Sequence, residues 1–422
     1  MNSDYKEVFA MAGPLARALP DYAYRPEQAL MAKAVGAALA RLEPLIVEAG
    51  TGTGKTFAYL VPALLSGRSV IISTGTRTLQ DQLFRRDVPM LARALGLPAK
   101  IALLKGRTNY LCRHRLELAT QQGAILGPER NVARLLARVS RWAATTKSGD
   151  LAELTDLPEQ SPIWPSITST RENCLGQECP QFSRCHVNEA RRNAQAADIV
   201  VVNHHLLLAD LALKDEGFGD LLPGAEAVIL DEAHQVPDIA AQFFGQAWSV
   251  RQVQVLMRDI TAELAAAAIR APALVEAVLA VDGHVEGLRF ALQRGAGRYE
   301  WSDLPDAFLD ALPEIETALS ELAEQLEGLG GGAGTANCAR RAAHLANTLA
   351  NLGELPDESG LRWVEAGASG MTLQYTPFEI AERLREYVES RPCAWIFTSA
   401  TLAVGDDFSH FAARIGLGKM SP

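Results

Sequence analysis

The sequence predicts an α/β protein with a parallel β-sheet, and three observations support this fold class. Short apolar segments, typical of buried parallel strands, alternate with segments that have helical periodicity. A glycine-rich loop at residues 49–56 separates the first such strand from the next helix, in the order typical of a phosphate-binding loop. The alternation stops twice, over residues 106–197 and again from about residue 235 to 361, which indicates two insertions into the sheet domain.

The first half of the sheet is predicted from residues 26–104. A helix is expected over residues 26–42, because Leu30, Val35, Ala38 and Leu42 fall on one stripe. The elements expected after it are a strand at 44–48, a helix at 57–65, a strand at 69–73, a helix at 78–95 and a strand at 100–104. Strands that alternate with helices in this way form parallel sheets.

The sheet is expected to resume after the first insertion. Two apolar, β-branched strands are predicted at 198–202 and 227–230. The second insertion has an almost wholly helical pattern, with a flexible break at 328–334. A hairpin of strands 361–365 and 371–375 around residues 367–370, a helix at 377–390 and a last strand at 394–397 complete the prediction.

The composition is that of an ordinary globular protein. Of 422 residues, 48% are hydrophobic and 21% are charged, which argues against disorder. No run of about 18 apolar residues could span a bilayer, and residues 1–20 lack the pattern of an export signal, so we expect a cytoplasmic protein without a membrane partner. Six cysteines are too few for a disulfide framework, and in a reducing compartment a cluster of them favours metal binding.

The charge is distributed unevenly. The net charge is −10, yet residues 1–205 contain 25 Lys and Arg against 18 Asp and Glu, whereas residues 206–422 contain 15 against 32. The first half could therefore face phosphate groups, although a solvated basic face is the commoner explanation of such a bias.

The glycine-rich loop predicts a site for ATP and Mg²⁺. Its residues are Ala49, Gly50, Thr51, Gly52, Thr53, Gly54, Lys55 and Thr56, with Ala49 where the strict pattern has glycine. The glycines allow backbone N–H groups to point at phosphates, Lys55 would reach the β- and γ-phosphates, and the Thr56 hydroxyl would bind Mg²⁺. The alternative is a glycine-rich turn with an incidental lysine.

Two adjacent carboxylates follow the predicted strand 227–230. The carboxyl end of a parallel strand is where ligands bind in such sheets, so Asp231 and Glu232 are expected beside the phosphate loop. Asp231 would hold Mg²⁺ and Glu232 would orient and deprotonate the attacking water. His234 could sense the γ-phosphate. The simpler interpretation is two acidic residues that open a helix and a packed histidine.

Four cysteines lie in the first insertion. Cys174, Cys179 and Cys185 follow a C-x4-C-x5-C spacing and Cys112 precedes them. Four thiolates could hold either zinc or an iron–sulfur cluster, and the spacing alone leaves both open, as well as unliganded cysteines. Cys338 and Cys393 stand apart, and Cys393 is expected to be a small core residue.

A basic segment surrounds Cys112. Lys105, Arg107 and Arg113 would neutralise phosphates there, and Tyr110 could stack on a base of single-stranded DNA. A solvated loop whose tyrosine packs on the insertion is the alternative.

Taken together, these motifs resemble those of a known family. Its members are the iron–sulfur superfamily 2 DNA helicases, and the similarity is greatest to the bacterial DinG/YoaA group, which is related to XPD. The segments that match are 25–28, 48–56, 73–76, 105–112, 203–205, 231–234 and 398–402. They occur in the family's order along the whole chain.

The resemblance implies a RecA-like P-loop motor domain with an iron–sulfur cluster insertion and a mostly helical arch insertion. The expected boundaries are 1–105, 198–235 and 361–422 for the motor domain, 106–197 for the cluster domain and 236–360 for the arch. A [4Fe-4S] cluster would be held by Cys112, Cys174, Cys179 and Cys185. Arg25 and Gln28 would contact adenine, and Thr398, Ser399 and Thr401 would couple the nucleotide state to the grip on DNA.

The function that the resemblance implies is ATP-dependent unwinding of DNA in the 5′ to 3′ direction, in repair or replication. Single-stranded and forked DNA, and a replication or repair protein, are the expected partners of a monomer. Because the family has a second RecA-like domain after the segment at 398–402, we expect a C-terminally truncated form that hydrolyses ATP poorly and does not unwind processively. The alternatives are a non-translocating module that binds single-stranded DNA or a protein partner, and a small-molecule phosphoryl transferase.

Overall fold

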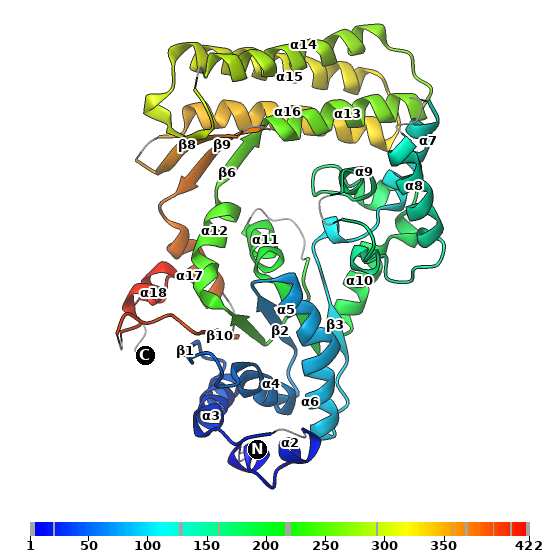
Figure 1. Cartoon of the computed structure of the whole chain (residues 1–422). Coiled ribbons are helices and arrows are strands. Elements are labelled where there is room, and N and C mark those ends of the chain that lie inside the picture. The colour runs from blue at the N-terminus through cyan, green and yellow to red at the C-terminus, as the bar shows by residue number, and fades with distance from the viewer. Residues whose placement is uncertain are drawn as a thin grey trace. The chain divides into compact units, whose positions relative to one another are not determined.

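The computed structural model of the chain describes residues 5–19, 22–125, 130–158, 161–215, 221–292, 294–356, 358–367, 370–390, 392–405 and 407–418. These residues form two compact units (Figure 1). Unit 1 contains residues 1–106, 189–244 and 379–422, and unit 2 contains residues 107–188 and 245–378. Both segments that interrupt the sheet pattern thus contribute to unit 2.

Unit 1 is built on a six-stranded sheet in which every neighbouring pair is parallel. Its strand order is β1-β10-β5-β2-β4-β3. The strands are β1 Leu45–Glu48, β2 Val70–Thr74, β3 Ile101–Leu103, β4 Ile199–Asn203, β5 Ala227–Asp231 and β10 Ala394–Ser399. The predicted α/β fold class with a parallel sheet is confirmed.

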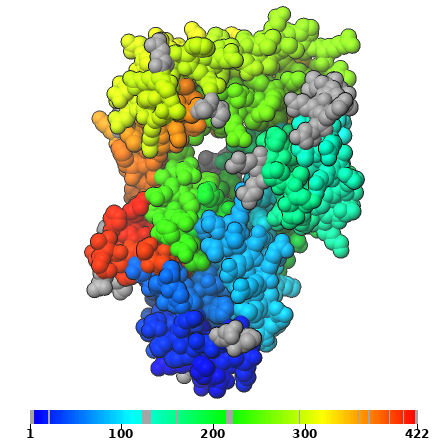
Figure 2. Space-filling model, in the orientation of Figure 1, coloured from blue at the N-terminus to red at the C-terminus, as the bar shows by residue number. Residues whose placement is uncertain are grey.

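Helices cover both faces of this sheet because its strands are apolar on both faces. In β4, Ile199 and Val201 pack into one core with α3 and α4, whereas Val200 and Val202 pack into the other with α11 and α12. The helices on the two faces, and those beside them, are α1 Tyr5–Phe9, α2 Pro14–Ala18, α3 Pro26–Arg41, α4 Lys55–Ser66, α5 Arg77–Gln82, α6 Val88–Leu95, α10 His186–Gln195, α11 His204–Asp215, α12 Val236–Phe244, α17 Ile380–Glu389 and α18 Ser409–Arg414. In the space-filling view, the blue, green and red segments of this unit pack against one another (Figure 2).

Unit 2 combines helices with a smaller antiparallel sheet of order β6-β9-β8-β7. The strands are β6 Gln246–Ser249, β7 Gly297–Glu300, β8 Gly360–Gly367 and β9 Gly370–Pro377. The helices are α7 Arg113–Ile125, α8 Arg130–Ala143, α9 Trp164–Ile167, α13 Val250–Ala266, α14 Pro272–Ala291, α15 Asp306–Gly328 and α16 Ala333–Glu354. One hydrophobic core contains residues of the four helices α13, α14, α15 and α16 and of the antiparallel sheet. A second core contains residues of α7, α8 and α9.

Three expectations about local structure need correction. The second insertion is not wholly helical, because β6 and β7 lie within it and extend the predicted hairpin to four strands. The helix expected over 78–95 contains a π-helical segment, Leu83–Asp87, between α5 and α6. Leu30 lies outside the buried stripe of α3 and is 70% exposed, whereas Val35 is fully buried. Residues 368 and 369, which belong to the segment expected to turn the hairpin, lie outside the described residues.

None of the described helices combines the length with the apolar character that a membrane crossing requires.

Candidate nucleotide-binding site

The predicted nucleotide residues gather at the carboxyl ends of neighbouring strands of unit 1. The glycine-rich loop follows β1, Asp231 ends β5, and Thr398 and Ser399 end β10. Because β10 lies between β1 and β5, these three strand ends form one continuous edge. Segments that are far apart in the sequence therefore meet in one compact site, because the strands that carry them are parallel neighbours.

The loop has the backbone conformation that its glycines permit. Gly52 and Gly54 have φ values of 86° and 80°, a region that favours glycine. Thr53 closes the turn by donating its hydroxyl to the Gly50 carbonyl at 2.8 Å. α4 begins at Lys55, so its first N–H groups open toward the loop, as required for a phosphate site. A turn with an incidental lysine would require none of this arrangement.

Lys55 and the acidic pair converge. The Lys55 Nζ lies 3.7 Å from the Glu232 Oε1, and both side chains are largely but not completely covered. Asp231 is 6% exposed, and its Oδ2 accepts a hydrogen bond from the Tyr59 hydroxyl at 3.0 Å. Tyr59 lies on α4, one turn after Lys55, and therefore connects the helix of the phosphate loop to the acidic strand end.

Burial raises the pKa of Asp231. Its pKa is raised to about 6, first by burial and then by the neighbouring Glu232 carboxylate, while the Tyr59 hydroxyl and Lys55 act in the opposite direction. A cation placed at this carboxylate would favour the ionised form. Lys55 and Tyr59 only partly offset the charge of the Asp231 carboxylate, so this carboxylate has the chemistry of a ligand for a divalent cation.

The segments around Glu232 and Ser399 are connected by side chains. Ser399 donates to the Glu232 Oε2 at 3.2 Å, and the His234 Nδ1 lies 2.8 Å from the same Ser399 hydroxyl. The backbone N–H of Thr401 reaches that hydroxyl at 3.4 Å. Thr398 is fully buried beside them. Of the residues expected to couple nucleotide state to DNA grip, Ser399 therefore contacts the acidic turn directly, Thr401 contacts Ser399, and Thr398 is the strand neighbour of Asp231.

Gln28 and Arg25 lie beside the loop. Gln28 is 2% exposed and donates its Nε2 to the Gly54 carbonyl at 2.9 Å. A Cβ at Gly54 would approach this Nε2 to 2.1 Å and Arg25 Nη1 to 3.5 Å, so both side chains approach the end of the phosphate loop. Their expected contact with adenine stays a prediction.

Sequence reasoning assigned no individual role to three residues of this site, Glu48, Tyr59 and His204, although Glu48 and His204 lie in segments that match the family. The Glu48 Oε2 accepts hydrogen bonds from the backbone N–H groups of Leu402 and Ala403 at 2.5 and 2.7 Å. These N–H groups, Ala403 first, lower the pKa of Glu48. Glu48 therefore joins β1 to the segment after β10. Its position just before the glycine-rich loop was the available signal.

The four cysteines of the first insertion belong to unit 2 and form no disulfide. Among the described residues, no set of three or more ligand side chains is gathered tightly enough to chelate one metal ion. The thiols nevertheless affect one another. The pKa of Cys112 is raised to about 11, first by burial and also by Cys179 and Cys174, and that of Cys179 is raised by burial, Cys174 and Cys185.

The donor set of Cys112, Cys174, Cys179 and Cys185 has the chemistry of a four-thiolate site, for either zinc or an iron–sulfur cluster. Cys338 and Cys393 are 1% and 2% exposed and belong to cores, which confirms the expectation for Cys393.

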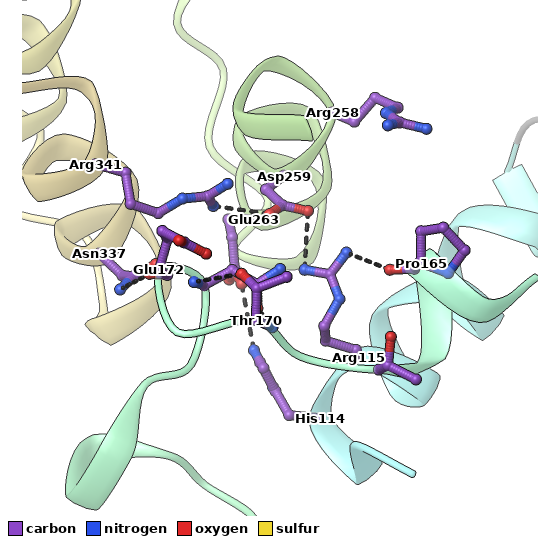
Figure 3. A network of polar contacts seen from close by, with 12 residues as sticks. His114, Arg115, Pro165, Thr170, Glu172, Arg258, Asp259, Glu263, Asn337 and Arg341 are labelled. Carbon is purple, nitrogen blue, oxygen red and sulfur yellow. Dashed lines mark hydrogen bonds and ion pairs between the residues drawn. The ribbon is translucent and has the colours of Figure 1, made fainter. Parts of the chain in front are cut away.

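A buried ionic network connects the cysteine-bearing segment to the long helices of unit 2 (Figure 3). Asp259 on α13 accepts the Arg115 guanidinium at 2.9 Å and the Arg341 guanidinium at 2.7 Å, one on each oxygen. Arg115 follows Cys112 by three residues and also donates to the Pro165 carbonyl at 3.1 Å. His114 lies 3.2 Å from Glu263. The helix that begins beside Cys112 is thereby fixed to α13 and α16.

Two of the expected DNA contacts need correction. Lys105 is 4% exposed, and its Nζ lies 3.1 Å from the Asp81 Oδ1, so its charge is already paired inside unit 1. Tyr110 is also 4% exposed and bridges to Asp150 through its backbone, so its ring cannot stack on a base in this conformation. Arg107 and Arg113 are partly exposed, and their contact with DNA stays a prediction.

Comparison with known proteins finds homologues along most of the chain. Residues 28–143 match the DEAD/DEAH box helicase family. The chain is 42% identical to the ATP-dependent DNA helicase YoaA of Haemophilus influenzae over 97% of its own length, and 41% identical to that of Escherichia coli K12 over the same share. This chain is a homologue of the YoaA and DinG helicases. The ATP-dependent DNA helicase DinG of Photobacterium profundum is a more distant relative, 28% identical over 89% of this chain.

The chain spans 64% of the length of each of these two YoaA relatives and 61% of that of the DinG relative. Among solved structures, a chain described as truncated XPD aligns with 92% of this chain at 12% identity, with a TM-score of 0.47.

Proposed function

We propose that this chain is the ATP-binding motor portion of a DNA helicase that acts on single-stranded and forked DNA in repair or replication. The observation that carries the proposal is the 3.7 Å approach of the Lys55 Nζ to the Glu232 carboxylate, next to the buried Asp231, at one edge of a parallel sheet. A lysine and two acidic residues at this position are the groups that ATP-driven motors use to bind and cleave a nucleotide triphosphate. The family's relatives are named ATP-dependent DNA helicases.

Each residue then has a defined task. The N–H groups of the loop and Lys55 bind the phosphates, and Thr56 and Asp231 would hold Mg²⁺, which neutralises charge on the phosphate oxygens. Glu232 orients the attacking water and accepts its proton. Ser399 and His234 contact Glu232 and are placed to transmit the state of the γ-phosphate to the segment after β10. Gln28 and Arg25 would bind adenine.

ATP hydrolysis that depends on DNA tests the proposal. We expect single-stranded DNA to stimulate hydrolysis by the purified chain, and Lys55→Ala to abolish the stimulated rate, because the β- and γ-phosphates lose the lysine of the loop. Small phosphoryl acceptors should have no effect. Stimulation by a small acceptor instead of DNA would identify a phosphoryl transferase, and DNA binding without any ATP hydrolysis would identify a non-translocating module.

We further propose that Cys112, Cys174, Cys179 and Cys185 hold a [4Fe-4S] cluster. The supporting observations are the four mutually interacting thiols and the ionic network that fixes the start of α7. The cluster would stabilise the segment 107–188, and the helices α13–α16 would form an arch along the DNA path. The cytoplasm, which keeps such clusters and free thiols reduced, is the proposed location.

Removal of one thiolate tests the cluster. Protein purified without oxygen is expected to be brown, with broad absorption near about 400 nm, and Cys174→Ser to be nearly colourless with less bound iron. Cys338→Ser is the matched control, because Cys338 lies in a helical core and should leave the iron content unchanged. A colourless wild-type protein with one bound zinc would contradict the proposal.

A further inference from the structure

His204 is a buried histidine whose two ring nitrogens both have partners at the edge of the nucleotide site. It is the first residue of α11, directly after β4, and is fully buried. Its Nε2 lies 2.9 Å from the Asp231 carbonyl oxygen, and its Nδ1 lies 2.7 Å from the Ser73 hydroxyl on β2. Because a carbonyl only accepts, Nε2 carries the proton, and in the neutral ring Ser73 donates to Nδ1.

The hydrogen bonds from Ser73 through His204 to Asp231 connect three strands at their carboxyl ends, where the nucleotide is proposed to bind. β2 lies between β5 and β4, so Ser73, His204 and Asp231 connect the ends of three neighbouring strands. The bonds are made away from water, where a lost partner leaves a buried polar group unsatisfied. The geometry of the Asp231 carbonyl is therefore set by groups that do not themselves reach the nucleotide.

The peptide after this carbonyl requires such support. Glu232 has φ 58° and ψ 45°, a left-handed conformation that is unfavourable for a residue other than glycine. In this conformation the Glu232 side chain faces Lys55 and Ser399, and its backbone N–H reaches the Asp231 Oδ1 at 3.1 Å. If the Asp231 carbonyl could rotate, the peptide could relax and both carboxylates would change direction.

We propose that His204, oriented by Ser73, is a positioning residue for ATP hydrolysis: it fixes the Asp231–Glu232 peptide and thereby aims the two carboxylates at the Mg²⁺ and the attacking water. The inference rests on the proposed function. His204 is fully buried and bonds to the Asp231 carbonyl rather than to either carboxylate, so its effect is exerted through the acidic turn. Because any buried histidine needs partners for its ring nitrogens, the substitutions below are what separate positioning from packing.

Three substitutions separate positioning from packing. His204→Leu keeps an apolar volume but loses both bonds, His204→Gln retains a donor that can reach the Asp231 carbonyl, and Ser73→Ala removes only the orienting hydroxyl. The matched control is His205→Ala, because the neighbouring His205 is exposed and packs on Phe243 with a ring separation of 6.0 Å.

The measurements are ATP affinity with and without Mg²⁺ and the single-turnover hydrolysis rate. We expect His204→Leu to bind ATP normally in the presence of a chelator, to lose most of the gain in affinity that Mg²⁺ provides, and to hydrolyse ATP about 10- to 100-fold more slowly. His204→Gln should recover most of both losses, Ser73→Ala should be intermediate, and His205→Ala should match the wild type. If the role of His204 were purely structural, the substitution would also weaken ATP binding in the presence of the chelator.

The outcomes distinguish this inference from the function on which it rests. If the wild type binds Mg·ATP and His204→Leu shows the same Mg²⁺-dependent gain and rate, the inference is overturned and the proposed function stands. If His204→Gln is as impaired as His204→Leu, bonding to the Asp231 carbonyl is not the cause and the inference also fails. If the wild type binds no nucleotide, both fail. Should His204→Leu not fold, Ser73→Ala and His204→Gln decide by the same criteria.

Discussion

Glu232→Gln is expected to retain ATP binding and to hydrolyse ATP about 10²- to 10⁴-fold more slowly than the wild type. The amide keeps the size of the side chain and can still contact Ser399, but it cannot accept the proton of the attacking water. Hydrolysis is best followed in single turnovers with excess protein, where even a slow wild-type rate is visible. Nucleotide affinity, measured in parallel, should change little.

Glu226→Gln provides the matched control for this substitution. Glu226 directly precedes β5, at the end of the strand opposite to Glu232, and pairs with Arg68 at the surface. The same chemical change there should leave hydrolysis unchanged. If Glu232→Gln hydrolysed ATP at the wild-type rate, Glu232 would not be the base, and the assignment of the acidic pair would be wrong.

Asp259→Ala is expected to destabilise unit 2 by about 3–5 kcal/mol, because it leaves the Arg115 and Arg341 guanidiniums buried without their shared carboxylate. The side chain of Arg115 is 13% exposed and those of Arg341 and Asp259 are each 9% exposed, so both guanidiniums stay largely desolvated after the shared carboxylate is lost. Since a two-unit chain need not unfold in one step, the suitable measurement is amide hydrogen exchange in α13 and α16, with α4 of unit 1 as an internal reference.

The control lies one residue from the network. Arg340 makes an exposed pair with Glu178 at 3.6 Å, and Arg340→Ala should have little effect because such pairs are screened by water. Equal protection in Asp259→Ala and Arg340→Ala would show that the buried network does not hold the cysteine-bearing segment to the helices. Loss of bound iron in Asp259→Ala alone would connect the network to the cluster.

The parts of the site that could be predicted from the sequence are those that depend on short, local sequence patterns. The glycines of the loop 49–56 predict its conformation. Asp231 and Glu232 follow an apolar strand, and the carboxyl end of such a strand lies at the edge of a parallel sheet where ligands bind. The convergence of Lys55 with Glu232 follows from these two facts together with the sheet order. Burial of the apolar strands on both faces then follows from their composition.

Other features depend on contacts between distant segments and leave no local pattern. β6 is a four-residue strand that pairs only with β9, far along the chain, and its sequence has no alternation strong enough to distinguish it from the helices around it. The basic character of Lys105 predicted an exposed contact, whereas its pairing with Asp81 depends on how α5 packs against β2 and β4. The bonds of His204 and Glu48 likewise require strand ends that only the folded sheet brings together.

The most direct test of the central claim is a calorimetric titration of the wild-type chain with ATP in the presence of Mg²⁺. The account predicts saturable binding of one nucleotide per chain, weakened when Mg²⁺ is chelated, because Lys55, Thr56 and Asp231 act on one Mg·ATP. An absence of any binding heat at all nucleotide concentrations, with the sheet folded, would contradict it.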